Sequence, residues 1–368
     1  MKYYLIAGER SGDLHASNLM KSLKQHDPEA EFRFFGGDYM KAVGGQMVVH
    51  YKELAFMGFL EVLKNLGTIR KYIGLCKKDI IEYNPHALIL IDYAGFNLRI
   101  AKYAKKKGIP VYYYISPKIW AWNQKRAYKI KKYVDHMFAI MPFEVAFYKK
   151  FGFEEVSYVG NPVVDAIAQY NLDQDFLVNN GVRDSSKKIV AVLPGSRAQE
   201  LSYILPTITE VIKRNEQLIY LVGVVDNLPQ TLYAELSVLE NVKLISGSTY
   251  DILAHADVAL VTSGTATLET ALWDTAQVVL YKGSKLSILI ARLLIKVKYI
   301  SLVNLILDEK CVTELIQGDC TVERVEDELN KLLERPTNYE DLKNAIGDHH
   351  ASEKTAIGII SKLEQLEI

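Results

Sequence analysis

Short apolar runs alternate along the chain with longer stretches in which apolar residues recur every three or four positions. The short runs are rich in β-branched and aromatic residues, as strands are, and the longer stretches have the period of an amphipathic helix. The alternation is typical of a parallel sheet covered by helices. In the first part of the chain it predicts strands over 3–7, 31–35, 87–91, 110–115, 136–140 and 156–159, and helices over 13–25, 66–83, 97–107, 123–133 and 142–151.

A second series of the same kind begins after Gly160 to Pro162, so we predict an α/β chain of two doubly wound domains facing a cleft. The first domain is expected over 1–165 and the second over 166–345. Apolar residues on one helical face predict a terminal helix within 346–368 that packs back on the body. The strands of the second series are expected over 188–193, 217–222, 242–245, 257–261 and 276–280.

Composition and charge narrow the class of protein. The 368 residues are 49% hydrophobic, which indicates a globular chain, and they carry 44 basic and 44 acidic side chains. This balance leaves no overall basic field, so nucleic-acid binding is not expected and any anion site must be local. Three scattered cysteines predict neither a disulfide framework nor a zinc site and favour a reducing cytoplasm: Cys76, Cys311 and Cys320.

Two apolar segments raise the question of a membrane. The first apolar run is too short for a signal peptide, and no run approaches the length of a membrane-spanning helix. Residues 54–66, with Met57 and Phe59, are apolar almost all round, and residues 284–300 mix leucine and isoleucine with four cations. Each segment is either a buried helix or a surface element that lies on a bilayer or holds an acyl chain.

The loop AGERSGDLH, residues 7–15, stands between the first strand and the first helix. It contains neither the dinucleotide fingerprint nor the P-loop pattern, although Gly8 and Gly12 permit a tight turn and a close backbone approach to a ligand. Ser11 and Asp13 either cap the following helix or face a ligand. A cap does not need the further polar side chains of this loop, which are Glu9, Arg10 and His15.

Two turns in the second series have the character of phosphate sites. Gly195, Ser196 and Arg197 follow a strand and precede a helix, where backbone N–H groups and a guanidinium suit a diphosphate. Ser263, Gly264 and Thr265 repeat the arrangement, and Glu269, one turn into the helix, can accept hydrogen bonds from ribose hydroxyls. The alternative for the first turn is an ordinary strand-to-helix turn with a surface arginine. The alternative for the second turn is a plain capped helix, which would not explain Glu269.

The first series offers a carboxylate and two tryptophans at strand ends. Asp92 ends a fully apolar strand and is either a general base or a helix cap. Trp120 and Trp122 follow the next strand and are accompanied by six basic residues within 118–132. Tryptophans beside lysines can stack on a sugar or meet lipid headgroups, and the alternative is packing in the core.

Taken in order, these motifs resemble the lipid-A-disaccharide synthase family from the first strand to the terminal helix. The residues that carry the resemblance are AGERSGDLH, Gly36-Gly37, ELAFMGFLEVL, SPKIWAWNQKR, LPGSRAQE, SGTATLE and YISLVNLI. The resemblance implies an inverting glycosyltransferase of the GT-B type with two Rossmann-like domains. Its reaction would move 2,3-diacylglucosamine from UDP to 2,3-diacylglucosamine 1-phosphate, forming a β-1,6-linked disaccharide and releasing UDP.

The resemblance also assigns sides to the site. It puts UDP on the C-terminal domain at Gly195 to Arg197, Ser263 to Thr265, Glu269 and Asn304. The acceptor and the membrane would meet the N-terminal domain at Gly8, Ser11, Gly12, Met57, Phe59, Trp120 and Trp122. The resemblance implies neither a metal nor a cofactor. It also implies a peripheral position on the cytoplasmic face of the inner membrane. A homodimer is one oligomeric state that it allows.

One departure affects the choice of base. The family commonly has the pattern I-D-x-P-D-F, and this chain reads IDYAGFN, with Gly95 at the second aspartate. The carboxylates left to deprotonate the acceptor hydroxyl are Asp92, Glu9 and Asp13, while Arg197 would take up charge on departing UDP. Two other functions stay open: a UDP-N-acetylglucosamine 2-epimerase or another GT-B enzyme on a soluble sugar, and a non-catalytic, membrane-associated module that binds nucleotide sugars.

Overall fold

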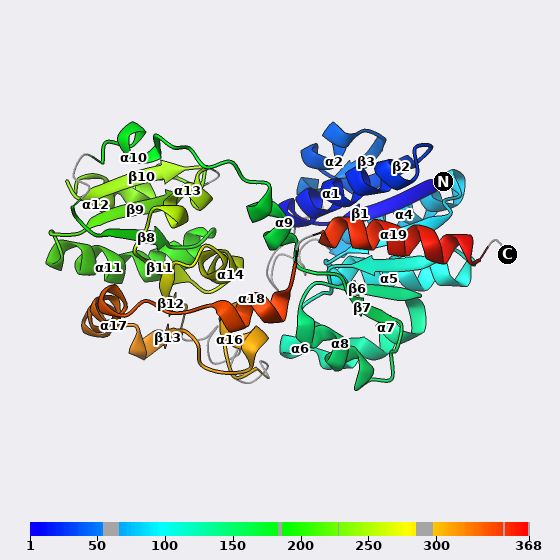
Figure 1. The fold of residues 1–368 in the computed structure, drawn as a ribbon. Coiled ribbons are helices and arrows are strands. Elements are labelled where there is room, and N and C mark those ends of the chain that lie inside the picture. Colours follow the sequence, from blue (N-terminus) through cyan, green and yellow to red (C-terminus); the bar gives the residue numbers. More distant parts are fainter. Residues whose placement is uncertain (54–65, 183–185, 227, 285–296, 349, 367–368) are drawn as a thin grey trace. The chain divides into compact units, whose positions relative to one another are not determined.

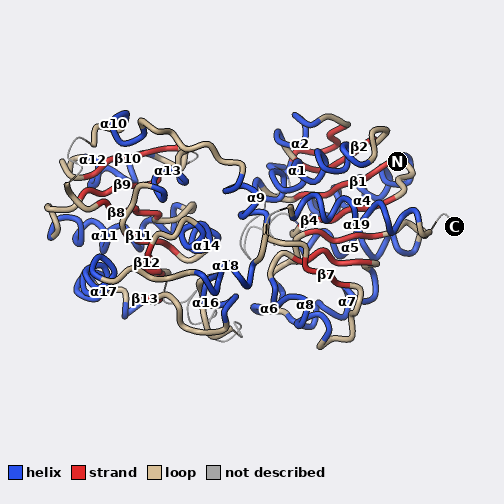
Figure 2. The backbone as a smooth tube through the Cα atoms, viewed as in Figure 1, coloured by secondary structure: helices blue, strands red, loops and turns tan. Residues whose placement is uncertain are grey.

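The computed structural model describes residues 1–53, 66–182, 186–226, 228–284, 297–348 and 350–366. These residues form two compact units, unit 1 with residues 1–165 and 348–368 and unit 2 with residues 166–347. Each unit is a parallel sheet with helices on both faces, which confirms the predicted fold class (Figure 1, Figure 2). Residues 54–65, with Met57 and Phe59, and residues 285–296 lie outside the described residues, so the structure does not describe most of the two apolar segments.

Unit 1 contains a seven-stranded sheet of order β3-β2-β1-β4-β5-β6-β7, in which every pair is parallel. The sequence analysis did not predict β3, an edge strand in which Val49 alone is fully buried. The strands are β1 Lys2–Ala7, β2 Glu31–Gly36, β3 Gln46–His50, β4 Ala87–Ile91, β5 Val111–Tyr114, β6 His136–Ala139 and β7 Val156–Tyr158.

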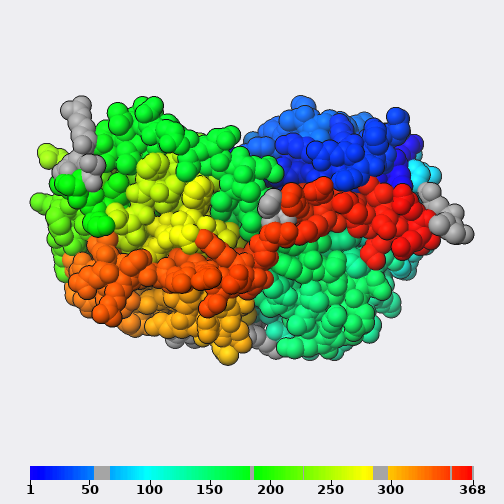
Figure 3. All heavy atoms as spheres, in the orientation of Figure 1, coloured from blue at the N-terminus to red at the C-terminus, as the bar shows by residue number. Residues whose placement is uncertain are grey.

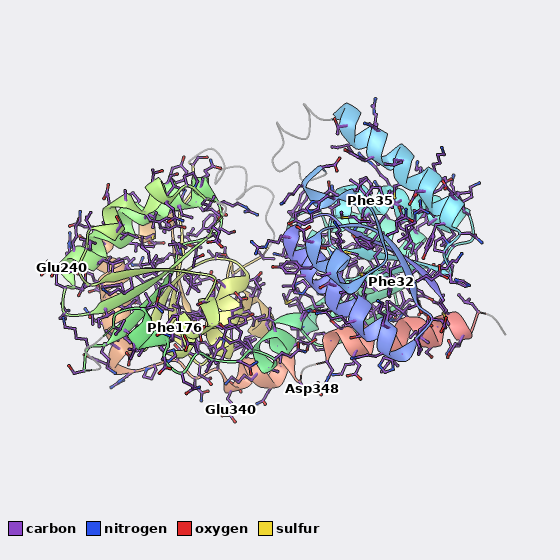
Figure 4. All side chains as sticks on the ribbon, turned by 90° about the horizontal axis from the view of Figure 1, so that it is seen from above. Phe32, Phe35, Phe176, Glu240, Glu340 and Asp348 are labelled. Atoms are coloured by element: carbon purple, nitrogen blue, oxygen red, sulfur yellow. The ribbon has the colours of Figure 1, made fainter. Side chains whose placement is uncertain are left out.

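Helices bury apolar residues on both faces of this sheet. Phe32 and Phe35 of β2, labelled in Figure 4, belong to the two separate cores on these faces. The core of Phe35 is closed by α4 Leu66–Tyr83, α5 Ala94–Lys106, α7 Ala127–Tyr133 and α8 Pro142–Lys149. The core of Phe32 is closed by α1 Arg10–His26, α2 Asp38–Val43 and α19 Ala351–Glu364. The predicted helix 123–133 is divided into a turn of 3-10 helix, Gln124–Arg126, and α7.

The last helix of the chain, α19, belongs to unit 1 and packs against α1. In Figure 3 its atoms lie at the surface beside those of the N-terminal segment. The carboxylate of Asp165 accepts hydrogen bonds from the first backbone N–H groups of this helix, those of His350 at 2.6 Å and Ala351 at 3.2 Å. A negative charge at a helix N-terminus is favourable, so Asp165 fixes where α19 begins.

Unit 2 contains a six-stranded parallel sheet of order β10-β9-β8-β11-β12-β13. The predicted strands are present, and the short β13, with a single fully buried residue, was missed. The strands are β8 Ile189–Leu193, β9 Ile219–Val224, β10 Val242–Ser246, β11 Val258–Thr262, β12 Ala276–Tyr281 and β13 Thr313–Ile316. The helices used below are α9 Pro162–Ala168, α11 Ala198–Arg214, α13 Thr249–Ala254, α14 Thr265–Leu272 and α16 Leu302–Leu307. None of the described helices combines the length with the hydropathy that a membrane-spanning helix requires.

Candidate active site

Each sheet reverses its winding direction at one point. In unit 1 the chain moves outward from β1 through β2 to β3 and then continues from β4 on the other side of β1. In unit 2 the same reversal separates β8 from β11. Ligands of open parallel sheets bind beyond the carboxyl ends of the strands at such a point. The four loops that follow β1, β4, β8 and β11 are therefore the places to look for a site.

In unit 1 the strands β1 and β4 end side by side, with Ala7 paired to Ile91. Gly8 is buried, and a Cβ atom at this position would fall 2.3 Å from the ring of Tyr93, so only glycine fits. Glu9 has extended backbone and precedes α1, and its carboxylate accepts a 2.7 Å hydrogen bond from the Ser11 hydroxyl. The predicted loop residues Gly8, Glu9 and Ser11 are thus brought beside the turn at Asp92.

Asp13 has a different role from the one its position predicts. It does not cap its own helix α1; its buried carboxylate accepts hydrogen bonds from three backbone N–H groups, those of Gly37 (2.7 Å), Tyr39 (3.0 Å) and Met40 (3.2 Å). Both oxygens are therefore engaged at the N-terminus of α2. The interpretation of Asp13 as a cap of the helix that follows it is wrong, and the carboxylate fixes the β2–α2 turn instead.

Asp92 and Tyr93 both have left-handed backbone, with φ of 41° and 46°. Two successive residues other than glycine in this region are unusual and are held by their surroundings. The Asp92 carbonyl accepts hydrogen bonds from the Asn97 amide, at 2.9 Å, and from the Tyr113 hydroxyl. Tyr93, not Asp92, is the residue before α5, and no side chain caps that helix, so the alternative role of Asp92 as a helix cap is wrong.

The environment of Asp92 makes its carboxylate more basic than usual. Burial first, and then the negative charge of Glu9, raise the pKa of Asp92 from 3.8 to about 6, while Lys118 and the Tyr93 N–H act in the opposite direction. A group with this pKa is ionised at neutral pH and accepts a proton more readily than an ordinary aspartate. The raised pKa of Asp92 is compatible with its predicted role as a general base.

The two tryptophans lie in different environments. Trp120 is buried and donates a 3.0 Å hydrogen bond from Nε1 to Glu144, which the sequence analysis did not single out. The Glu144 carboxylate also accepts the N–H groups of Ile140 and Met141, and burial raises its pKa to about 7. Glu144 follows Pro142 in the first turn of α8, and an acid at this place in a predicted helix is the sequence feature that could have identified it. Trp122 is 45% exposed.

In unit 2, Leu193 of β8 pairs with Val261 of β11, so the two predicted phosphate turns begin side by side. Gly195 has φ of 112°, and a Cβ there would meet the Glu200 carboxylate at 3.0 Å. Arg197 immediately precedes α11, whose first N–H groups face the same edge of the sheet. Its side chain is 66% exposed and is paired with Glu200 at 3.0 Å, which leaves most of the guanidinium open to an anion.

The second turn is formed by Ser263, Gly264 and Thr265, with Gly264 directly before α14. The Ser263 hydroxyl donates to the carbonyl of Ile300 at 2.7 Å, so it already has an acceptor, while Thr265 is exposed. Glu269 lies one turn into α14 and accepts a 3.1 Å hydrogen bond from Tyr250. Backbone N–H groups, an exposed hydroxyl and a carboxylate therefore surround the end of β11.

Asn304 is buried in α16, and its amide makes four hydrogen bonds. It donates to the Val312 carbonyl and to Glu314, both at 2.9 Å, and accepts from the N–H groups of Cys311 at 2.8 Å and Val312 at 2.9 Å. These bonds use every donor and acceptor position of the amide. In this geometry Asn304 fixes the loop before β13 and does not present its side chain to a nucleotide.

Comparison with known proteins identifies the family. The model of the family described as lipid-A-disaccharide synthetase matches residues 3–365. The lipid-A-disaccharide synthase of Trichlorobacter lovleyi is 38% identical over 98% of this chain and 97% of its own length. That of Syntrophus aciditrophicus is 37% identical over 99% of this chain and 95% of its own length.

Solved structures show the fold. The UDP-GlcNAc 2-epimerase of Neisseria meningitidis, bound to UDP-GlcNAc, aligns with a TM-score of 0.67 over 100% of both chains at 12% identity. The epimerase of Methanocaldococcus jannaschii, with UDP-GlcNAc and UDP, aligns with a TM-score of 0.66 over 98% of this chain and 100% of its own at 14% identity. At such identities the likeness concerns the GT-B fold alone. By its sequence over nearly the whole length, the chain belongs to the lipid-A-disaccharide synthase family.

Proposed function

We propose that this protein transfers 2,3-diacylglucosamine from UDP to 2,3-diacylglucosamine 1-phosphate, with inversion at the anomeric carbon, to form the β-1,6-linked disaccharide and UDP. Membership in the family supports the reaction. The proposed residue roles rest on the two points where the sheets reverse their winding direction. Asp92, whose pKa is raised, lies at this point in unit 1, and Arg197 and Glu269 lie at this point in unit 2.

The donor half of the proposal rests on unit 2. The N–H groups at the start of α11, the backbone of Gly195 and Ser196 and the guanidinium of Arg197 would bind the diphosphate. Those at the start of α14, with Gly264 and Thr265, would add to them, and Glu269 would accept hydrogen bonds from the ribose. As the bond between the anomeric carbon and the diphosphate oxygen breaks, these groups stabilise the negative charge that develops on UDP.

The acceptor half rests on unit 1. Asp92 would take the proton of the acceptor 6-hydroxyl while that oxygen forms its bond to the anomeric carbon. A single displacement of this kind inverts the configuration. Gly8 and Gly12 would line the acceptor site, and Glu9 would act on Asp92 through its charge. Asp13 is not proposed as the base, because its carboxylate already accepts three backbone hydrogen bonds.

We place the protein in the cytoplasm, peripherally on the inner face of the inner membrane. The support is local: residues 118–132 carry six cations and no acid, and Trp122 and Tyr128 beside them are 45% and 60% exposed. Exposed aromatic rings with cations suit an anionic lipid surface. Co-sedimentation with vesicles containing about 30% anionic phospholipid should fall when Lys125, Lys129 and Lys132 are replaced by glutamine. Unchanged co-sedimentation would contradict this placement.

The reaction is tested by incubating the purified protein with UDP-2,3-diacylglucosamine and 2,3-diacylglucosamine 1-phosphate and identifying the product by mass spectrometry. Absence of a disaccharide would overturn the proposal. Turnover of UDP-N-acetylglucosamine without a lipid acceptor would instead indicate an epimerase, and binding without turnover would indicate a nucleotide-sugar-binding module.

The role of Arg197 is tested with a matched pair of variants on α11. Arg197→Ala should lower kcat/KM by roughly 100-fold or more, because a cation that stabilises the departing diphosphate is lost. Arg214→Ala removes an exposed, ion-paired arginine at the other end of the same helix and should leave kcat/KM unchanged. Near-normal turnover by folded Arg197→Ala would remove this residue from the mechanism.

A further inference from the structure

A tyrosine stands behind the carboxylate at the proposed nucleotide site. Tyr250 of α13 donates a hydrogen bond from its hydroxyl to Oε1 of Glu269 on α14, at 3.1 Å. Among the residues that the structure describes, Oε2 of Glu269 has no hydrogen-bond partner. One oxygen is therefore held by the protein, and the other remains free to accept from a ligand.

Two further rings hold Tyr250 in place. The ring of Tyr170 packs edge-on against it with centroids 5.0 Å apart, and the ring of Trp273 lies 6.0 Å away. Tyr170 also contacts Trp273, at 6.5 Å, so the three rings form one cluster. Packing among the three rings restricts where the Tyr250 hydroxyl points.

Tyr170 is anchored to α13, the helix that carries Tyr250. Its hydroxyl donates to Oδ2 of Asp251 at 2.5 Å, and the N–H of Asp173 donates to Oδ1 at 2.9 Å. Farther along the same segment, Phe176, labelled in Figure 4, stacks on His255 with centroids 5.3 Å apart. The segment 170–176 is thus attached to Asp251 of α13 and to His255, the residue that follows this helix.

We propose that Tyr250 is a positioning residue for nucleotide binding: it holds the Glu269 carboxylate so that its free oxygen accepts hydrogen bonds from the ribose hydroxyls. This inference rests on the proposed function, which places the nucleotide at this site. Tyr250 donates its hydroxyl to Glu269, so its effect is exerted on affinity for the nucleotide through this carboxylate.

The charge state of Glu269 gives the proposal a second, independent consequence. Burial raises the pKa of this carboxyl, and the hydrogen bond from Tyr250 lowers it. Tyr250 is the titratable side chain that α13 places against Glu269, and Tyr170 lies behind Tyr250. Without the Tyr250 hydroxyl the carboxyl should protonate at a higher pH and then lose its capacity to accept two hydrogen bonds.

The test is calorimetric binding of UDP alone to the full-length protein, with Tyr250→Phe as the variant. Loss of a hydrogen bond to a charged acceptor should weaken UDP binding by roughly 5- to 30-fold. The loss of affinity on acidification should also begin at a higher pH than in the unsubstituted protein. In a Glu269→Gln background, Tyr250→Phe should shift no such pH dependence, because the titrating group is gone.

Tyr220 of the same unit supplies a matched control. Tyr220→Phe removes a buried hydroxyl that has no hydrogen-bond partner among the described residues. This variant should bind UDP like the unsubstituted protein. Equal UDP affinity and an unchanged pH dependence in folded Tyr250→Phe would overturn the inference, whatever the transfer assay shows. If Tyr250→Phe weakens UDP binding but no disaccharide forms, the inference stands and the proposed reaction fails.

Discussion

Ala7 and Ile91 are register partners at the carboxyl ends of β1 and β4, and this pairing brings the loop of Glu9 beside the turn of Asp92. The consequence is electrostatic. The Glu9 carboxylate is one of the two causes that raise the pKa of Asp92 to about 6, after burial. The pKa of the proposed base is therefore raised by a residue in the loop that follows a different strand, β1.

Replacing Glu9 by glutamine removes the charge and keeps the shape. The pKa of Asp92 should then fall, and the acid limb of the plot of kcat/KM against pH should move to lower pH. The measurement is the transfer rate from about pH 5 to about pH 8. Glu82→Gln, an exposed glutamate of α4, is the matched control and should leave the limb in place. A limb that stays fixed in Glu9→Gln would mean that Asp92 does not set it.

Asp92 should also cost the protein stability at neutral pH. Its folded pKa of about 6 lies above the ordinary value of 3.8, so the protonated form is favoured by folding. The stability associated with the protonated carboxyl is fully present below the unfolded pKa of about 3.8, and it is lost as pH rises through the folded pKa of about 6. Asp92→Asn should therefore raise the free energy of unfolding by about 1–3 kcal/mol at about pH 8, with little change at about pH 3.5, while abolishing transfer. Denaturant titrations at both pH values provide the check, and equal stability at both would contradict it.

The parts of the fold that the sequence predicted are those dictated by local pattern. Runs such as Leu88 to Ile91 are apolar on both faces because helices cover both sides of the sheet, and such runs are visible without any partner. This signal is weaker in edge strands: β3 and β13 were missed, although the edge strands β7 and β10 were predicted. The two turns proposed to bind the diphosphate were also recognisable in the sequence, because each places glycine and small hydroxyl residues between a strand and a helix.

The roles of single polar residues were less predictable, because their partners are distant in the sequence. Asp13 was expected either to cap its own helix or to face a ligand, but its carboxylate accepts hydrogen bonds from backbone N–H groups 24 to 27 residues further along the chain. Asn304 matched a family position, yet its hydrogen bonds show a saturated amide. Glu144 gave only the weak signal of an acid in the first turn of a helix. A sequence shows which groups are polar, and the fold decides whether those groups remain free.

Asp13→Ala should destabilise unit 1 by about 2–4 kcal/mol, because it leaves buried N–H groups at the start of α2 without an acceptor. Denaturant unfolding measures the loss. Asp38→Asn changes an exposed acid in the same turn and should stay within about 0.5 kcal/mol of the unsubstituted protein. An Asp13→Ala protein of unchanged stability that had lost transfer would show that Asp13 acts in the reaction.

Asn304→Ala should behave in the same way in unit 2. Removal of a saturated, buried amide should cost about 2–4 kcal/mol, whereas Asn330→Ala, at an exposed position of the helix Val322–Glu334, should cost little. Thermal unfolding followed by circular dichroism distinguishes the two. A stable Asn304→Ala protein with weakened UDP binding would show instead that the side chain meets the nucleotide.

Gly95→Asp introduces a carboxylate at the position where the resemblance described above leads us to expect a second aspartate. A Cβ at Gly95 meets no atom within 4 Å, and the residue lies in the first turn of α5, where an aspartate also favours the helix dipole. The variant should therefore fold with a stability equal to or about 0.5–1.5 kcal/mol above that of the unsubstituted protein. Gly74→Asp, at an equally open position of α4, is the control for a carboxylate placed elsewhere on a helix.

If Asp92 is the base, Gly95→Asp should keep kcat within about threefold and move the acid limb of the pH profile upward, because a new negative charge close to Asp92 raises its pKa. The double variant Asp92→Asn, Gly95→Asp should stay inactive; recovery of transfer in it would assign the base to position 95 and remove Asp92 from that role.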